Sequence, residues 1–234
     1  MEITSIAIDA VDLGNDYHGD IIKLAEQNKK FILDLFNKLT SKAKKLFGER
    51  DKGWEIVEIQ LNLSCDNPML LPHVHYPEEG KKKMIIRTID CFFSSKKGYR
   101  INDCKLIYQL SHEICHTLYP TGDNNVIFLE EGISVYFSFR CLHDYALESI
   151  RNKPEYLRIE KYIKDSGSQI DGIKYGKALE YVKKLGKNVD AIGSIVRELR
   201  VKTPIISNLL FSDLEKIGIE DNLAHNLVSQ FPIS

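Results

Sequence analysis

The order of apolar and polar residues predicts strands and one long helix in the first half of the chain. Apolar and polar residues alternate over 54–63, and a second apolar segment covers 84–93, so both are predicted β-strands. A weaker apolar pattern at 2–11 predicts a short first strand. Residues 19–47 carry apolar side chains at helical spacing, which predicts an amphipathic helix that ends near Gly48.

The pattern becomes helical throughout the second half of the chain. The predicted helices cover 145–165, 174–185, 188–200, 205–217 and 221–230. No internal repeat or low-complexity segment interrupts them. We therefore expect one compact domain over 1–234, with an α+β lobe over 1–119 and a helical lobe over 120–234.

The residues with the clearest chemistry lie between these two halves. In His112-Glu113-Ile114-Cys115-His116, the two histidines are four residues apart and share one face of a helix, and Glu131 follows. Glu113 lies about 100° round the helix from His112, which suits contact with a metal-bound water better than metal ligation. Two histidines and one glutamate are a known ligand set of catalytic zinc. We therefore expect Zn2+ on His112, His116 and Glu131.

The residues around this segment support two consecutive helices. The uncharged neighbours of the histidines are Leu110, Ile114, Cys115, Thr117 and Leu118. Pro120 and Gly122 are expected to end the first helix, and an apolar run at 126–129 leads into the second, with Glu131 in an early turn. The alternative is a buried amphipathic helix with two incidental histidines.

The stretch resembles the gluzincin zinc metallopeptidases, in particular their aminopeptidase-type branch. The sequence Leu129-Glu130-Glu131-Gly132-Ile133-Ser134-Val135-Tyr136 is similar to the segment that carries their third ligand. The resemblance implies that Glu131 is the ligand and Glu130 its neighbour. It also implies a zincin-like α+β fold: an N-terminal α/β lobe with a mixed sheet, a helical C-terminal lobe, and the active-site cleft between them.

The chain departs from that family in three places. The gap between His116 and Glu131 is shorter than in the large aminopeptidases, and Ser138 stands where many relatives carry a glutamate behind the ligands. The Gly-x-Met-Glu-Asn type of motif that helps to bind a substrate's amino terminus is missing, so exopeptidase activity is not implied.

A second match to the same family lies in the helical half. Lys174-Tyr175-Gly176-Lys177-Ala178 resembles a helix start that reads Tyr-x-Lys-Gly in those enzymes, with Ala178 in place of the glycine. The resemblance implies that Tyr175 donates a hydrogen bond to the oxyanion, beside Glu113 as the general base. The alternative is a packing tyrosine, one of eleven in the chain.

Two further segments have candidate roles. Gluzincins bind an extended peptide along the strand before the active-site helix, and the 84–93 strand holds that place here, so we expect it to be the substrate-binding edge. The loop sequence His73-Val74-His75 could form a second metal site, although an ordinary loop is favoured.

The lysines of the 19–47 helix are interpreted as a solvated face rather than a functional basic patch.

Composition limits the class of protein. A net charge of −1 and 28% charged residues give no nucleic-acid signature. No apolar run has transmembrane length and the N-terminus has no signal core, so we expect a cytoplasmic protein without a membrane partner. The five cysteines, an odd number in apolar contexts, are expected to be free and mostly buried.

The sequence therefore predicts a zinc metallopeptidase that acts on a peptide or protein substrate. Two alternatives stay open: a regulatory protease with one protein target, and a non-catalytic binding module on a zincin fold. The second is less favoured, because a structural zinc site needs no general base such as Glu113. Endo- or exopeptidase action and the oligomeric state are left open.

Overall fold

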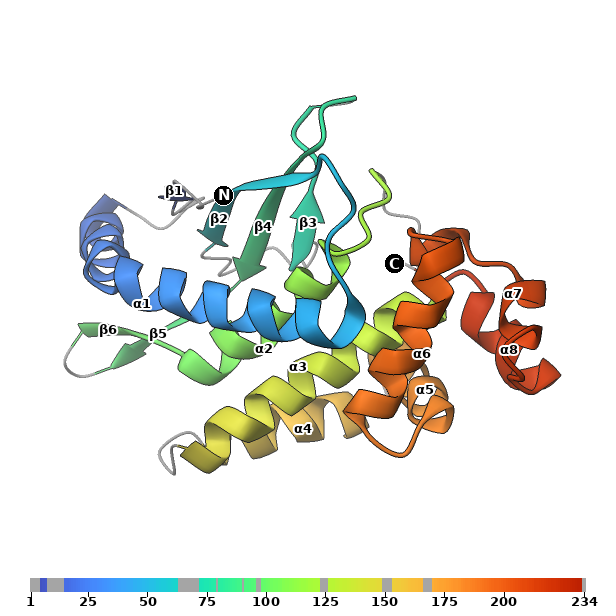
Figure 1. The fold of residues 1–234 in the computed structure, drawn as a ribbon. Helices are drawn as coiled ribbons and strands as arrows, with labels where there is room; N and C mark the ends of the chain where they lie inside the picture. The colour runs from blue at the N-terminus through green and yellow to red at the C-terminus, as the bar shows by residue number, and fades with distance from the viewer. Residues whose placement is uncertain are drawn as a thin grey trace.

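All the described strands, and the long first helix, come before residue 102 in the chain, and the named elements after that point are helices (Figure 1). The computed structural model describes residues 5–7, 15–62, 72–78, 80–89, 91–95, 98–122, 126–148, 153–165 and 170–232. The strands are β1 Ser5–Ala7, β2 Glu55–Asn62, β3 His73–His75, β4 Lys83–Ile89, β5 Phe92–Ser95 and β6 Gly98–Ile101. The helices are α1 Asn15–Phe47, α2 Asp103–His116, α3 Phe128–Glu148, α4 Lys153–Asp165, α5 Ile170–Leu185, α6 Val189–Lys202, η3 Ile206–Asn208, α7 Phe211–Glu215 and α8 Asp221–Val228. The predicted α+β class is confirmed.

A four-stranded mixed sheet, in the order β1-β2-β4-β3, lies above α1 and α2 (Figure 1). β1 and β4 run parallel to β2, and β3 runs antiparallel to β4. Within β4, Ile86 is paired with Ile59 of β2 on one side and with Val74 of β3 on the other. β4 is therefore an inner strand.

Because β4 lies between two other strands, the expectation that residues 84–93 form the substrate-binding edge of the sheet is wrong. That segment is also two strands, because β5 leaves the main sheet and, among the described strands, pairs with β6 alone in a separate hairpin. The edge beside β4 is β3, at the residues that were expected to be a loop. A strand of three residues is too short to give a clear alternating pattern.

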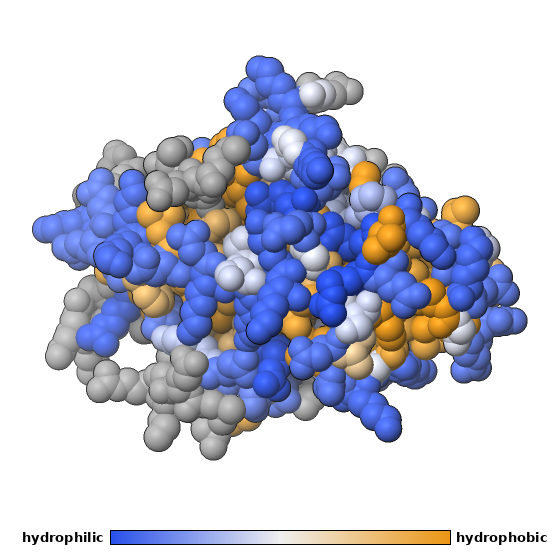
Figure 2. Space-filling view, in the orientation of Figure 1, coloured by the Kyte–Doolittle hydropathy of each residue, from blue (hydrophilic) through white to orange (hydrophobic). Residues whose placement is uncertain are grey.

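The long helix α1 has the two faces that its sequence predicts. Its buried side chains are Ile32, Phe36, Leu39, Ala43, Leu46 and Phe47. Lys29, Lys30, Lys38 and Lys45 are exposed on its other side. Figure 2 shows the face of the molecule across which α1 runs, and that face is mostly hydrophilic. The buried side belongs to one hydrophobic cluster that also contains side chains of the sheet and of α2, α3, α5, α6 and α8.

The helical half differs from the prediction in two segments. The predicted helix 145–165 is divided between the end of α3, which reaches Glu148, and α4, which begins at Lys153. Residues 205–217 are not one helix but the short η3 and α7, because Leu209 and Leu210 adopt extended backbone conformations between them. This break places η3 against α3, near the histidine segment.

Four thiols, those of Cys91, Cys104, Cys115 and Cys141, are free and buried, as predicted. Cys65 lies outside the described residues. Among the helices that the structure describes, none combines the length and apolar character needed to cross a membrane.

Candidate metal centre

Helix α2 presents both histidines because of how it begins and what it buries. The side chain of Asn102 caps its N-terminus by accepting a hydrogen bond from the Lys105 amide at 3.0 Å. Its apolar face packs into the core through Leu106, Ile107, Leu110 and Ile114. His112 and His116 lie in its last two turns, with side chains only 12% exposed.

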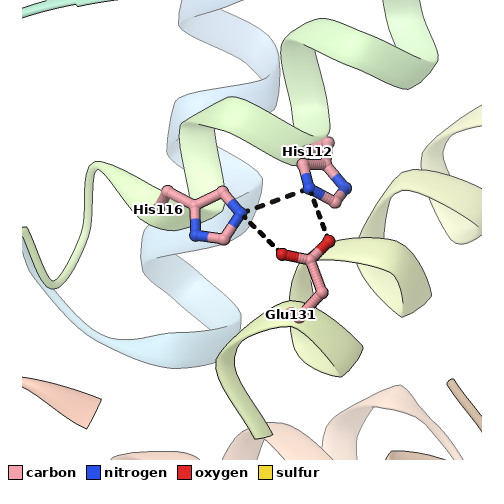
Figure 3. Close-up of side chains that lie close together, drawn as sticks. All are labelled: His112, His116 and Glu131. Atoms are coloured by element: carbon pink, nitrogen blue, oxygen red, sulfur yellow. Dashed lines mark hydrogen bonds and ion pairs between the residues drawn. The ribbon is translucent and has the colours of Figure 1, made fainter. Parts of the chain in front are cut away.

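Helix α3 supplies the third group. The predicted early position of Glu131 is confirmed, because α3 begins at Phe128 and places this residue in its first turn. The side chains of His112, His116 and Glu131 point toward one another (Figure 3). The Nε2 atoms of the two histidines are 3.2 Å apart. The Glu131 carboxylate oxygens lie 3.0 Å from His112 Nε2 and 3.5 Å from His116 Nε2.

These three residues could hold a metal ion. One donor atom from each lies within 4.8 Å of the other two, and no other such group occurs in the described ranges. His73 and His75, the possible second metal site, do not belong to such a group. Their ring centroids are 6.2 Å apart, and His73 Nε2 lies 3.5 Å from the Arg87 guanidinium.

The charges at the site fit a cation. Three glutamates are nearly inaccessible there: Glu113 and Glu130 are each 3% exposed and Glu131 is 5% exposed. In the part of the chain that the structure describes, no lysine or arginine forms an ion pair with any of them. Glu131 Oε1 is buried and lies 3.0 Å from His112 Nε2, but it accepts no hydrogen bond from the described residues. Buried carboxylates need a compensating charge, and a divalent ion between the three ligands would supply it.

The ionisation of the site is consistent with this electrostatic demand. Burial alone lowers the pKa of His116, but its contacts with Glu130 and Glu131 raise that pKa well above its usual value. Burial alone raises the pKa of Glu131, yet His112 and His116 hold it below its usual value. His116 therefore favours its positively charged form and Glu131 its negatively charged form, as expected where a cation can replace a proton.

Glu113 lies beside this group without belonging to it. Its carboxylate makes no hydrogen bond or ion pair with the described residues, and burial raises its pKa although His112 and His116 oppose that shift. A buried carboxylate with a raised pKa and a free hydrogen-bonding capacity is suited to accept a proton. This agrees with the predicted distinction between Glu113 and the ligands.

Glu130 makes two contacts that the sequence did not reveal. Its Oε1 atom lies 2.8 Å from His116 Nδ1, and its Oε2 accepts a hydrogen bond from Ser207 of η3. Ser138, at the position where many gluzincins carry a glutamate, donates to the Ser134 carbonyl within α3 at 2.6 Å. The only local signal was the acidic pair Glu130-Glu131 at the start of a helix.

Tyr175 lies near the same group. Helix α5 packs along α3, and the Tyr175 ring centroid is 6.4 Å from that of His112 and 5.2 Å from that of Phe231. Lys177, the other residue of the Tyr-x-Lys match, is exposed. The fold thus brings Tyr175 beside the predicted ligands from a segment more than forty residues away.

Comparisons of the chain with protein-family models, with curated proteins and with solved structures gave no match. Any statement of function therefore rests on the chemistry of this group of side chains.

Proposed function

We propose that this protein is a zinc-dependent metallopeptidase of the gluzincin type, with His112, His116 and Glu131 as the zinc ligands. One observation carries the proposal: three convergent ligand atoms lie beside a buried glutamate, Glu113, that is not itself a ligand. Two imidazoles and one carboxylate are the donor set of catalytic zinc sites that keep a position for water. The four cysteines that the structure describes lie outside this group.

A bound zinc ion would polarise the scissile carbonyl and lower the pKa of a water molecule. The chain's own residues would then move the proton. Glu113 would accept it from the attacking water and deliver it to the nitrogen of the leaving amine, because its carboxylate has no competing partner in the described structure.

Tyr175 would donate a hydrogen bond to the oxyanion that develops on the substrate. The placement of its ring next to His112 supports this role, which was inferred from a short sequence match alone. Preorganised donors of this kind lower the barrier because they are oriented before the charge develops.

The substrate would be an extended peptide or a segment of a protein. β3, with its Val74 side chain buried and one backbone edge unpaired with any described strand, is the strand along which such a segment would pair. We propose a cytoplasmic location, because the four described cysteines are free thiols.

The test compares Glu113→Gln with the wild-type protein on a mixture of peptides, with cleavage products measured by mass spectrometry. The amide keeps the side-chain shape but cannot accept the proton, so zinc content should persist and turnover should fall below detection. Glu180→Gln, at an exposed position on α5, is the matched control and should cleave normally.

Cleavage by Glu113→Gln at the wild-type rate would contradict the assigned base. A wild-type protein that binds zinc tightly but cleaves no peptide would favour the non-catalytic binding module. Cleavage of one protein only would identify the regulatory protease.

A further inference from the structure

We propose that Ser207 and Glu130 form a positioning relay for His116, through which the segment after α6 sets the affinity of the site for its metal. The inference rests on the proposed function in one respect, the metal on His112, His116 and Glu131. Neither Ser207 nor Glu130 is a ligand in that proposal.

The relay begins at the imidazole of His116. Its Nε2 atom faces His112 and Glu131, and its Nδ1 atom lies 2.8 Å from Glu130 Oε1. A neutral histidine that ligates through Nε2 must carry its proton on Nδ1. That proton would be donated to Glu130, which fixes both the tautomer and the orientation of the ring.

Glu130 is itself held at both oxygens. Oε1 faces His116 and Oε2 accepts from the Ser207 hydroxyl, while the carboxylate is buried and has no lysine or arginine partner in the described residues. Loss of the Ser207 hydroxyl would leave Oε2 without its hydrogen bond. The carboxylate could then rotate or take up water, and its hydrogen bond to His116 would be less well aligned.

Ser207 is placed by contacts on either side of it. The neighbouring Ile206 and Leu209 are buried in the core. Arg200 donates to the Pro204 carbonyl at 3.2 Å and to the Leu118 carbonyl at 2.9 Å. The same guanidinium therefore connects the segment that carries Ser207 with the turn that follows His116.

The two ligand histidines differ in this support. His112 Nδ1 is buried and has no hydrogen-bond partner among the described residues. Only His116 is oriented by a second protein group there, so changes in the relay should affect metal affinity through this ligand.

The test measures the dissociation constant for Zn2+ by competition with a chromophoric chelator, at a temperature well below unfolding. Ser207→Ala should weaken zinc binding about 10-fold and Glu130→Ala up to about 100-fold, the usual range for groups behind a metal ligand. Ser207→Thr keeps a hydroxyl and should restore most of the affinity. Ser212→Ala, in the adjoining α7, is the matched control and should bind zinc like the wild-type protein.

The decisive comparison is the double variant. If Ser207 acts through Glu130, Ser207→Ala should cause no further loss in the Glu130→Ala background. An equal loss in both backgrounds, or zinc binding by Ser207→Ala as tight as by Ser212→Ala, would overturn the relay and leave the zinc site standing. A wild-type protein that binds no zinc would instead overturn the proposed function, and the relay with it.

Discussion

Gly132 of α3 and Ala178 of α5 lie so close that a β-carbon on Gly132 would stand 2.3 Å from the Ala178 carbonyl oxygen. It would also stand 2.5 Å from Val182 Cγ2. Gly132 directly follows Glu131, and Ala178 lies about one helical turn beyond Tyr175. The missing side chain thus allows the helix with the tyrosine to pack against the helix with the proposed ligand.

Substitution of this glycine should separate the two helices. Gly132→Ala adds a β-carbon for which the two helices leave no room. We therefore expect the free energy of unfolding to fall by about 1–3 kcal/mol, the usual cost of overpacking. Urea denaturation followed by circular dichroism measures this change. Turnover should fall as well, because Tyr175 would move with α5.

A second substitution distinguishes backbone crowding from side-chain crowding. Val182→Ala removes the nearby methyl groups but leaves the Ala178 carbonyl in place. It should therefore fail to rescue Gly132→Ala. Full recovery of stability in the double variant would show that the backbone contact is unimportant.

Arg200 should be a major source of stability where the ends of α1 and α2 meet α6. Its guanidinium donates to the carbonyls of Phe47, Leu118 and two other residues, and it lies 5.3 Å from the Tyr119 ring centroid. A lysine has one nitrogen and cannot reach these acceptors together. Arg200→Lys should cost at least about 3 kcal/mol, from the loss of two or more charged hydrogen bonds.

Urea denaturation also measures this cost. The control is Arg158→Lys, because Arg158 is 75% exposed and pairs only with Glu155 among the ion pairs of the described residues. It should change stability by less than about 1 kcal/mol. Equal effects of the two variants would contradict the structural role of Arg200.

Tyr175→Phe separates binding from catalysis. It removes one hydroxyl that we propose acts mainly in the transition state, so kcat should fall roughly 10²–10³-fold while KM and zinc content stay nearly constant. Tyr181→Phe, on the same helix, is the control and should retain normal turnover. Full activity of Tyr175→Phe would show that the sequence match in α5 is accidental.

Substrate should protect β3 from hydrogen exchange. An extended peptide held by the Glu113→Gln variant would pair with the free edge of this strand, so amides in 73–75 should exchange more slowly. β4 is already paired on both sides and should change little. Protection confined to the C-terminal helices would contradict substrate binding at this edge.

Local patterns predicted that His112, His116 and Glu131 would come together, because the information that places them is local. The spacing of His112 and His116 follows from helical geometry, and the apolar run before Glu131 marks the start of the next helix. The faces of α1 were predictable for the same reason. These features need only a few consecutive residues.

The features that sequence reasoning missed depend on distant residues. Glu130 meets Ser207 across 77 positions, and no periodic pattern links them. The edge role of β3 depends on strand order, because an apolar run such as 84–93 looks alike in an inner and an edge strand. Strand order and long-range hydrogen bonds follow from tertiary packing, which the local pattern does not specify.

The most direct test of the central claim is the zinc content of the purified protein after dialysis, measured by mass spectrometry of the metal. The wild-type protein should carry about one zinc ion per chain. His116→Ala should lose most of it, and His225→Ala, at an exposed position in α8, should keep it. A wild-type protein without zinc, or equal zinc content in all three proteins, would contradict the assignment of His112, His116 and Glu131 as ligands.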